Sequence, residues 1–345
     1  MNDSSRRDGN VAVAPATPLF GPRVLVPVAL LSLYFVWGST YLAIRVALAG
    51  YPPFLMAGVR FLCAGSALYA FLRWRGMAAP TRAQWLNAAT TGLMLLGIGN
   101  GLVCYAEQSV ASGLAAVAVA SMPLFAAVFG GLYGQWPRRM EWLGLGVGFA
   151  GVVLLNLGGS MSGSPIGALA LVVAAGSWAF GSVWSRRRNM PPAAMSTAAQ
   201  MLSAGAMLFV FALLVGERWP AAPSLSASLA LVYLAIAGSL IGFTAYLYVL
   251  NTVRPALATS YAYVNPPVAV LFGVLLAGEA VHGLDIVAMA VILGGVALIA
   301  LTREKSAQPA AQAADAAAAQ APLTTPAAPS SPAAAPRAAP DTGRR

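Results

Sequence analysis

Two charged side chains lie inside long apolar stretches, where a charge is costly unless it is paired or hydrated. Arg60 lies roughly 9 Å along a helix that would begin near Phe54. Its guanidinium is expected to face a cavity or a helix interface and to hold a carboxylate, either that of Glu107 or that of a substrate. The alternative for Arg60 is a structural anchor that reaches toward the membrane surface, and the alternative for Glu107 is a solvated position near a helix end.

Aromatic side chains form the second group. Tyr34, Trp37, Tyr41 and Arg45 recur at i, i+3, i+7 and i+11, which places them along one stripe of a helix. Rings gathered around a cavity would bind organic or cationic solutes, whereas the alternative is packing or an interfacial belt. The candidate substrate-binding residues are therefore Tyr34, Trp37, Tyr41, Arg60, Tyr105, Glu107, Trp178, Gln200, Tyr248, Tyr261, Tyr263 and Asn265.

Other reactive side chains are too few to build an enzyme site. The only lysine is Lys305 and the only histidine is His282, so the sequence has no phosphate-binding loop lysine and no Ser-His dyad within an apolar stretch. Cys63 and Cys104 lie at different expected depths and are interpreted as packing residues. We expect no catalysis, no metal and no cofactor.

The elements that must position these residues are membrane helices. The chain is 59% hydrophobic and 9% charged, with a mean hydropathy of +0.74, which leaves too little polar surface to cover a water-soluble protein of its length. Apolar windows long enough to cross a bilayer predict ten transmembrane helices, of which the fifth is the least apolar. Their expected limits are 25–47, 54–73, 86–108, 113–135, 141–158, 166–185, 194–216, 227–250, 257–278 and 284–302.

The first half of the chain is repeated in the second. Trp37 corresponds to Trp178, the pair Pro52-Pro53 to Pro191-Pro192, Arg60 to the uncharged Gln200, and Gly99 to Gly242. Such a long apolar repeat indicates a duplicated membrane unit. The loss of charge from Arg60 to Gln200 would suit one-sided handling of a charged substrate.

Two prolines occupy matched positions in the fourth and ninth expected helices. Pro123 follows Ser121-Met122 and Pro266 follows Asn265, and each would remove a backbone hydrogen bond and bend its helix. We interpret Pro123 and Pro266 as kinks that contribute to gating. The alternative is that they serve packing alone.

Arginines predict the orientation. If the N-terminus is cytoplasmic, the inner loops hold Arg73, Arg75, Arg82, Arg138, Arg139, Arg186, Arg187, Arg188 and Arg254, and the outer loops hold only Arg218, with Arg45 at a helix end. Both termini are therefore expected in the cytoplasm. Because each half has five helices, the halves would enter the membrane from opposite sides as an inverted repeat.

The expected domains are a cytoplasmic N-terminal segment (1–24), a first repeat (25–158), a second repeat (166–302) and a disordered Ala/Pro-rich cytoplasmic tail (303–345). A net charge of +10 would suggest nucleic acid in a soluble protein, but here its arginines bear on orientation and no nucleic-acid partner is expected. Gly144 and Gly148 form a G-x-x-x-G pattern for close helix packing. We favour packing within a monomer, with a homodimer as the alternative.

Four stretches, WGSTYLAIRVA, PPFLMAGVRF, AEQSVASGLAAVAVASMPLF and PALATSYAYVNPPVAV, resemble the EamA-type members of the drug/metabolite transporter superfamily. The resemblance covers roughly residues 25 to 302 and implies an all-α fold of ten transmembrane helices in two inverted halves around a cavity. It also implies alternating access for small metabolites or drugs.

We therefore expect a bacterial inner-membrane exporter of small metabolites, drugs or amino-acid-like solutes. It would work either by proton exchange through Glu107 or by facilitated diffusion. The alternative is a non-transporting membrane scaffold or sensor that keeps the fold.

Overall fold

The computed structural model describes residues 22–134, 136–137, 139–157, 164–253, 261–298 and 301. All of them belong to one compact unit, Met1–Arg303. The expected tail 303–345 and nearly all of the expected N-terminal segment 1–24 lie outside the described residues, as do Arg138, Arg254 and Lys305.

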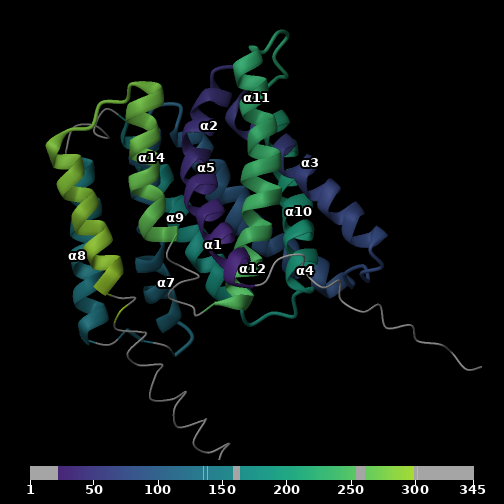
Figure 1. Ribbon diagram of the computed structural model, residues 1–345, viewed down its shortest axis with the longest axis horizontal. Coiled ribbons are helices and arrows are strands. Elements are labelled where there is room, and N and C mark those ends of the chain that lie inside the picture. Colours follow the sequence, from purple (N-terminus) through teal and green to yellow (C-terminus); the bar gives the residue numbers. More distant parts are fainter. Residues whose placement is uncertain are drawn as a thin grey trace, which may run out of the picture. The chain divides into compact units, whose positions relative to one another are not determined.

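Regular structure in the described ranges is helical throughout (Figure 1). The first half comprises α1 (Pro22–Ser32), η1 (Leu33–Trp37), α2 (Gly38–Leu48), α3 (Pro53–Trp74), α4 (Arg82–Gly92), η2 (Leu93–Asn100), α5 (Gly101–Ala106), α6 (Ser112–Val119), α7 (Met122–Gly131) and α8 (Arg139–Leu157). The second half comprises α9 (Pro165–Ser185), α10 (Ala193–Leu214), α11 (Leu225–Tyr233), η3 (Leu234–Ile241), α12 (Gly242–Thr252), α14 (Tyr261–Ala277) and a final helix, Gly283–Leu298.

Seven helical stretches in the described residues are long and apolar enough to cross a membrane. They are Arg23–Leu48, Pro53–Trp74, Arg82–Ala106, Ser112–Gly131, Pro165–Ser185, Ala193–Leu214 and Leu225–Tyr246. The other three expected spans are also helical: α8, the apolar helix Val264–Ala277 and the helix Gly283–Leu298. The protein is thus an all-helical membrane protein, and the number ten stays a prediction.

Several spans are not regular α-helices from end to end. The π-helical turns η1, η2 and η3 lie within the stretches Arg23–Leu48, Arg82–Ala106 and Leu225–Tyr246. A wider turn displaces backbone carbonyls from their usual partners and makes them available to neighbouring helices. Two such bonds form: Trp37 donates from Nε1 to the carbonyl of Gly238 in η3 at 3.1 Å, and Ser177 donates to the carbonyl of Met94 in η2 at 2.8 Å.

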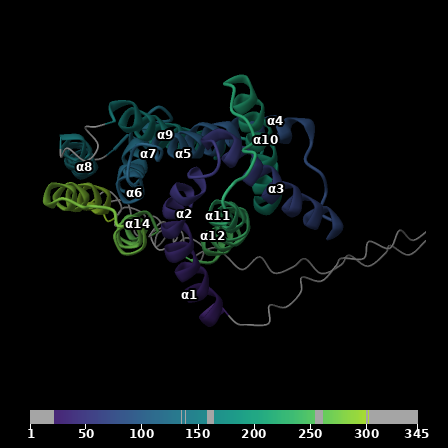
Figure 2. The same ribbon diagram turned by 90° about the horizontal axis from the view of Figure 1, so that it is seen from above.

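Helices of the first half pack mainly on helices of the second. Close pairs are α3 with α10, α2 with α11, α1 with α12, α9 with η2 and α5, and α14 with α2 and α6 (Figure 2). At the α3–α10 crossing, a Cβ on Gly205 would lie 2.7 Å from the backbone nitrogen of Leu62, so only glycine allows this approach. A Cβ on Gly295 would similarly lie 2.6 Å from the carbonyl oxygen of Gly144, so the G-x-x-x-G face packs within the chain.

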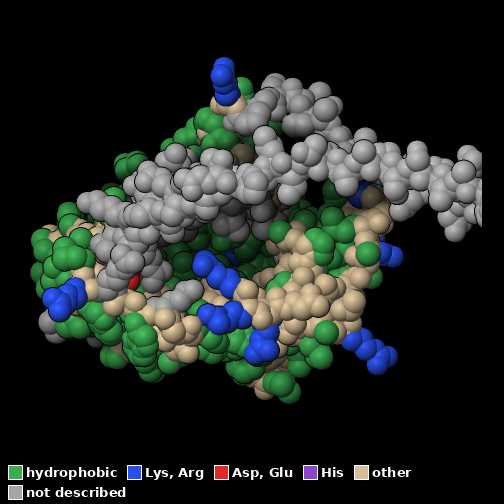
Figure 3. All heavy atoms as spheres, turned by 90° about the horizontal axis from the view of Figure 1, so that it is seen from below, with side chains coloured by type: hydrophobic (Ala, Val, Ile, Leu, Met, Phe, Trp, Pro, Cys, Tyr) green, Lys and Arg blue, Asp and Glu red, His purple; other side chains and the backbone are tan. Residues whose placement is uncertain are grey.

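The two ends of the bundle carry different charges. One end, here called the arginine end, holds Arg73, Arg75, Arg82 and Arg186–Arg188 at helix termini. The other, the carboxylate end, holds Glu107, Glu217 and Glu279. Figure 3 views the molecule from below and shows Lys and Arg side chains in blue around a hollow in that face.

Candidate functional site

A cavity of about 100 Å³ lies between the two halves. Its walls come from η1, α2 and α3, from η2 and α5, and from α6, α7, α9, α12 and α14. The rings that line it belong to Trp37, Tyr41, Phe61, Trp178, Phe243 and Tyr261. Its other polar side chains are Thr40, Arg60, Asn100 and Asn265.

Arg60 brings a buried guanidinium into this cavity. The side chain is 4% exposed, and its Nε donates to the Ser239 hydroxyl at 3.0 Å. Gly238 makes room, because a Cβ there would lie 3.1 Å from Nη2 of Arg60. The Nη1 atom of Arg60 has no hydrogen-bond partner. A positive charge with a free donor therefore faces the cavity.

Glu107 is nearby but does not pair with Arg60. It follows the span Arg82–Ala106, is 1% exposed, and neither of its carboxylate oxygens accepts a hydrogen bond. Among the described residues no ion pair joins Glu107 to Arg60, so the pairing considered from the sequence is not seen. Burial and the neighbouring Glu279 carboxylate raise the pKa of Glu107, although Arg45 and Arg60 oppose this shift.

Trp37 anchors an aromatic cluster beside the cavity. Its ring centroid lies 5.3 Å from that of Phe243, 5.1 Å from Tyr261 and 5.5 Å from Tyr246. The contacts with Phe243 and Tyr261 are edge-to-face, which is a favourable arrangement for aromatic rings. With the indole N–H also bonded to Gly238, the ring of Trp37 is fixed in orientation.

The cavity gathers half of the candidate residues. Trp37, Tyr41, Arg60, Trp178, Tyr261 and Asn265 line it. It also includes Thr40, Phe61, Asn100 and Phe243, which the sequence did not single out. Thr40 and Phe61 adjoin predicted residues, but a polar or aromatic side chain inside an apolar helix does not by itself indicate which way it faces.

The other candidates lie elsewhere. Tyr34 and Tyr248 each pack against the buried cluster between α1 and α12, and Tyr105 stacks on Phe54 at a centroid distance of 6.0 Å. Gln200 donates to Ser196 at 2.9 Å within α10. Glu107 does not line the cavity, and the side chain of Tyr263 lies outside the described residues.

The paired prolines have different surroundings. The helix breaks between α6 and α7, and Pro123 is in the first turn of α7. Pro266 lies inside the continuous helix α14. The interruption is therefore found in the first half, next to Val119 and Met122 of the cavity wall.

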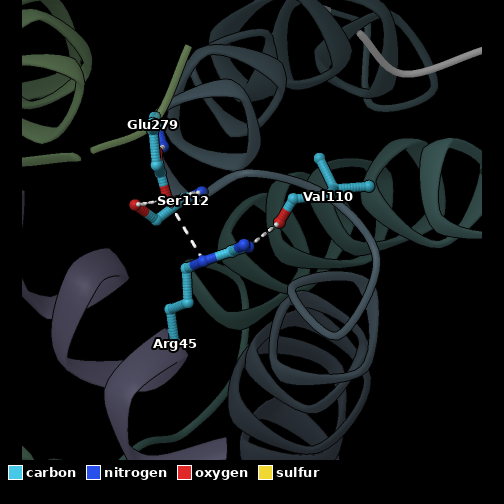
Figure 4. Close-up of polar contacts among 5 residues, drawn as sticks. Arg45, Val110, Ser112 and Glu279 are labelled. Atoms are coloured by element: carbon cyan, nitrogen blue, oxygen red, sulfur yellow. Dashed lines mark hydrogen bonds and ion pairs between the residues drawn. The ribbon is translucent and has the colours of Figure 1, made fainter. Parts of the chain in front are cut away.

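A charged cluster, here called the clasp, closes the carboxylate end (Figure 4). Oε1 of Glu279 accepts hydrogen bonds from the backbone and hydroxyl of Ser112 at 2.9 and 2.8 Å, and Oε2 accepts one from the Gly113 backbone at 3.1 Å. Arg45 Nε lies 3.4 Å from Glu279 Oε1, and Arg45 also donates to the Val110 carbonyl at 3.3 Å. Glu279 thus caps α6 and connects it to α2.

Apolar spans around a partly polar cavity define a multi-pass membrane protein with a cavity between its two halves. The EamA-like transporter family model matches the chain twice, at residues 25–157 and 165–301. The chain therefore belongs to the EamA-like transporter family, and the resemblance found in the sequence is confirmed.

Similar proteins agree with this assignment. The "Uncharacterized inner membrane transporter YedA" of Escherichia coli K12 is 49% identical over 82% of this chain and 91% of its own length. The "Uncharacterized transporter YdfC" of Bacillus subtilis is 29% identical over 75% and 86%. A solved crystal structure, described only as that of a protein, covers 81% of this chain and 96% of its own at 25% identity and a TM-score of 0.56. The chain is thus a multi-pass inner-membrane protein of the transporter class.

Proposed function

We propose that this protein exports small organic solutes from the cytoplasm by alternating access, with the cavity as its substrate site. The observation that carries the proposal is the cavity between the two halves, lined by fixed aromatic rings and by a buried guanidinium with a free donor. Ligand sites in proteins combine apolar walls with a few polar groups in this way. A membrane scaffold has no need of a buried, unpaired charge, which is costly at this depth.

The moving parts in this proposal are two inverted repeats of five helices, residues 25–158 and 166–302. The helix contacts support this arrangement, because a contact made by a helix of one half is matched by the contact of the corresponding helix in the other half. The stretch of α1 and α2 packs on that of α11 and α12, and correspondingly α9 packs on η2 and α5. Transporters of this general design bind solute at the interface of the repeats and rock one against the other.

The proposed orientation places both termini and the arginine end in the cytoplasm. Lys and Arg are enriched in cytoplasmic loops of membrane proteins, and the arginines of the loops after α3 and α9 lie at one end of the bundle. The clasp then faces the outside. Tags on the two termini that became accessible on opposite sides of the membrane would contradict this orientation.

Two modes of energy supply remain within the proposal. Glu107 is a buried carboxyl whose oxygens have no hydrogen-bond partner, which suits reversible binding of a proton. Facilitated diffusion needs no such group. A pH-sensitive dye inside proteoliposomes separates the two modes. Proton exchange changes the pH of the lumen when solute moves, whereas facilitated diffusion does not.

Solute flux in proteoliposomes tests the transport function itself. The purified protein should move a subset of a broad panel of small organic solutes, and Trp37→Ala should abolish this movement by removing the ring that contacts Phe243 and Tyr261. Trp37→Phe keeps an aromatic ring and should retain part of the flux. Trp219→Ala is the matched control, because Trp219 is 55% exposed and lies outside the cavity. No flux of any solute by the folded wild-type protein would favour a scaffold.

A further inference from the structure

A second hollow lies on the side of the bundle, behind the η2 wall of the cavity. It has a volume of about 670 Å³, and its walls come from the start of α3, from η2 and α5, and from the second half of α10. We propose that this hollow, here called the lateral groove, binds one acyl chain of a membrane phospholipid. The chain would pack against the back of the cavity wall and hold η2 in place.

The lateral groove has the chemistry of lipid tails. Every residue that lines it is a glycine or has an apolar side chain, so it has no polar side chain to orient a solute. Gly97 and Leu208 are buried at its base, whereas Met207 and Val210 at its edge are 38% and 55% exposed. The groove therefore opens sideways, toward the hydrocarbon that surrounds an apolar membrane span.

Its direction and depth match one leaflet. From Ala206 to Leu214 the groove follows α10 for about 12 Å, and one leaflet of hydrocarbon is about 15 Å deep. The groove ends beside Phe54, whose backbone N–H donates to Glu217 at the carboxylate end at 3.3 Å. It thus runs along the helices from the middle of the bilayer to that surface, as a lipid acyl chain does.

The same dimensions argue against a second copy of the protein as the occupant. A transmembrane helix is about 10 Å wide and crosses about 30 Å of hydrocarbon, so it needs a matching face in both leaflets. The lateral groove is confined to the half at the carboxylate end. A single flexible chain can fill it, because packing in a membrane depends on close contact with irregular walls.

The bound chain would contact the segment that also forms the cavity. Leu96 and Asn100 of η2 line the cavity, and Leu93 and Ile98 of the same segment line the lateral groove. One π-helical segment therefore separates the two spaces. Because a π-helical turn is a rare and less regular form of backbone, support from behind should restrict its opening.

Photo-crosslinking in proteoliposomes tests where a lipid chain lies. The full-length protein is reconstituted with a phosphatidylcholine that carries a diazirine near the end of one acyl chain, and the labelled residues are read by mass spectrometry. Labelling should concentrate on residues 93–102 and 206–214. Leu229 and Val232 of α11, which are 60% and 53% exposed, report ordinary contact with bilayer lipid. Labelling of the groove no stronger than labelling of α11 would overturn the proposal.

A groove-filling variant tests the site itself. Ala206 lines the lateral groove and is exposed, so Ala206→Phe should place a ring where the chain lies. In native mass spectrometry, the wild-type protein should retain one phospholipid and Ala206→Phe should lose it. The smaller Ala206→Leu should retain less than the wild type. Ala67→Phe is the matched control, because Ala67 is exposed on α3 outside the groove, and it should retain the lipid.

Hydrogen exchange tests the effect on η2. Phospholipid added to delipidated wild-type protein should slow backbone exchange in residues 93–100, and this response should be lost in Ala206→Phe and kept in Ala67→Phe. No retained lipid in the wild type, equal retention in Ala206→Phe, or unchanged exchange in η2 would each overturn the proposal. A wild-type dimer that Ala206→Phe separates would assign the groove to a second copy instead. None of these measurements uses solute movement, so their outcome is independent of the proposed transport function.

Discussion

Replacement of Glu279 by glutamine should open the carboxylate end of the protein. Glu279 is the centre of the clasp: it caps α6 through the backbone of Ser112 and Gly113 and pairs with Arg45. Glutamine keeps the size and one oxygen but replaces the other oxygen with an amide NH₂, which cannot accept from a backbone N–H. The substitution therefore removes one capping bond, the charge at the start of α6 and the ion pair.

The size of the effect follows from these three losses. A lost capping bond costs about 1 kcal/mol. Loss of the negative charge at a helix start costs about 0.3–1 kcal/mol. The ion pair contributes less than about 1 kcal/mol, because the Arg45 side chain is 42% exposed and screened by water. A total of about 2 kcal/mol shifts the equilibrium between closed and open forms by about 30-fold.

Cys104 is a built-in reporter of that opening. It lies in α5 near the carboxylate end and is fully buried, whereas Cys63 is exposed. In a Cys63→Ala background, we expect Glu279→Gln to increase the rate at which a charged, water-soluble thiol reagent modifies Cys104 by about 30-fold. The rate is read from mass spectrometry of the protein in proteoliposomes.

A matched variant tests whether charge alone is responsible. Glu217 caps α3 at the same end, accepting from the Leu55 backbone at 2.7 Å, but has no ion pair among the described residues. Glu217→Gln should lower thermal stability without raising the reactivity of Cys104. Unchanged reactivity in folded Glu279→Gln and Glu279→Ala proteins, or equal increases in the Glu217 variant, would refute the reasoning.

Three further outcomes are expected. Gly205→Ala should lower the free energy of unfolding by about 1–3 kcal/mol in thermal unfolding, because the new Cβ meets the backbone of α3, whereas Gly146→Ala, with open space around it, should not. Gly238→Ala should reduce solute flux in proteoliposomes by displacing the guanidinium of Arg60 from its place in the cavity wall. Glu107 binds its proton more tightly when folded, so wild-type stability should fall as pH rises above about 4.3, toward the raised pKa. Glu107→Gln should flatten that slope in unfolding curves measured between pH 5 and 8.

Hydropathy predicted where the helices lie but not how their backbones are bonded. All ten apolar windows contain helix, because apolar length and backbone satisfaction in lipid leave few other structures. The π-helical turns were not predicted, since hydropathy does not report which carbonyl a backbone N–H reaches, whereas an interruption at Pro123 was expected from the proline itself. Proline alone did not predict where a helix is interrupted: Pro123 follows a break, whereas Pro266 lies within a continuous helix.

In the site, helical periodicity predicted which side chains share a helix face, but not how far along the helix the cavity extends. The stripe from Trp37 to Tyr41 reaches the cavity, as helical periodicity indicates, and Tyr34 on that stripe lies beyond the end of the cavity. Tyr105 is a candidate that does not reach the cavity. It is two residues after Val103, which lines the cavity, and two residues rotate a helix by about 200°, so Tyr105 faces away.

Chemical asymmetry on a duplicated backbone gives the two ends of the protein different closing contacts. At the spacing that relates Gly99 to Gly242, Glu279 in the clasp corresponds to Trp136. The ring of Trp136 covers Gly131 so closely that a Cβ on Gly131 would lie 2.7 Å from it. One end is thus held by charge and helix capping, and the corresponding position at the other end by an aromatic ring. Salt screens the charged contacts of the clasp but does not screen the packing of the Trp136 ring. Raising the ionic strength should therefore weaken the clasp more than the contact at the other end, and so favour opening at the clasp.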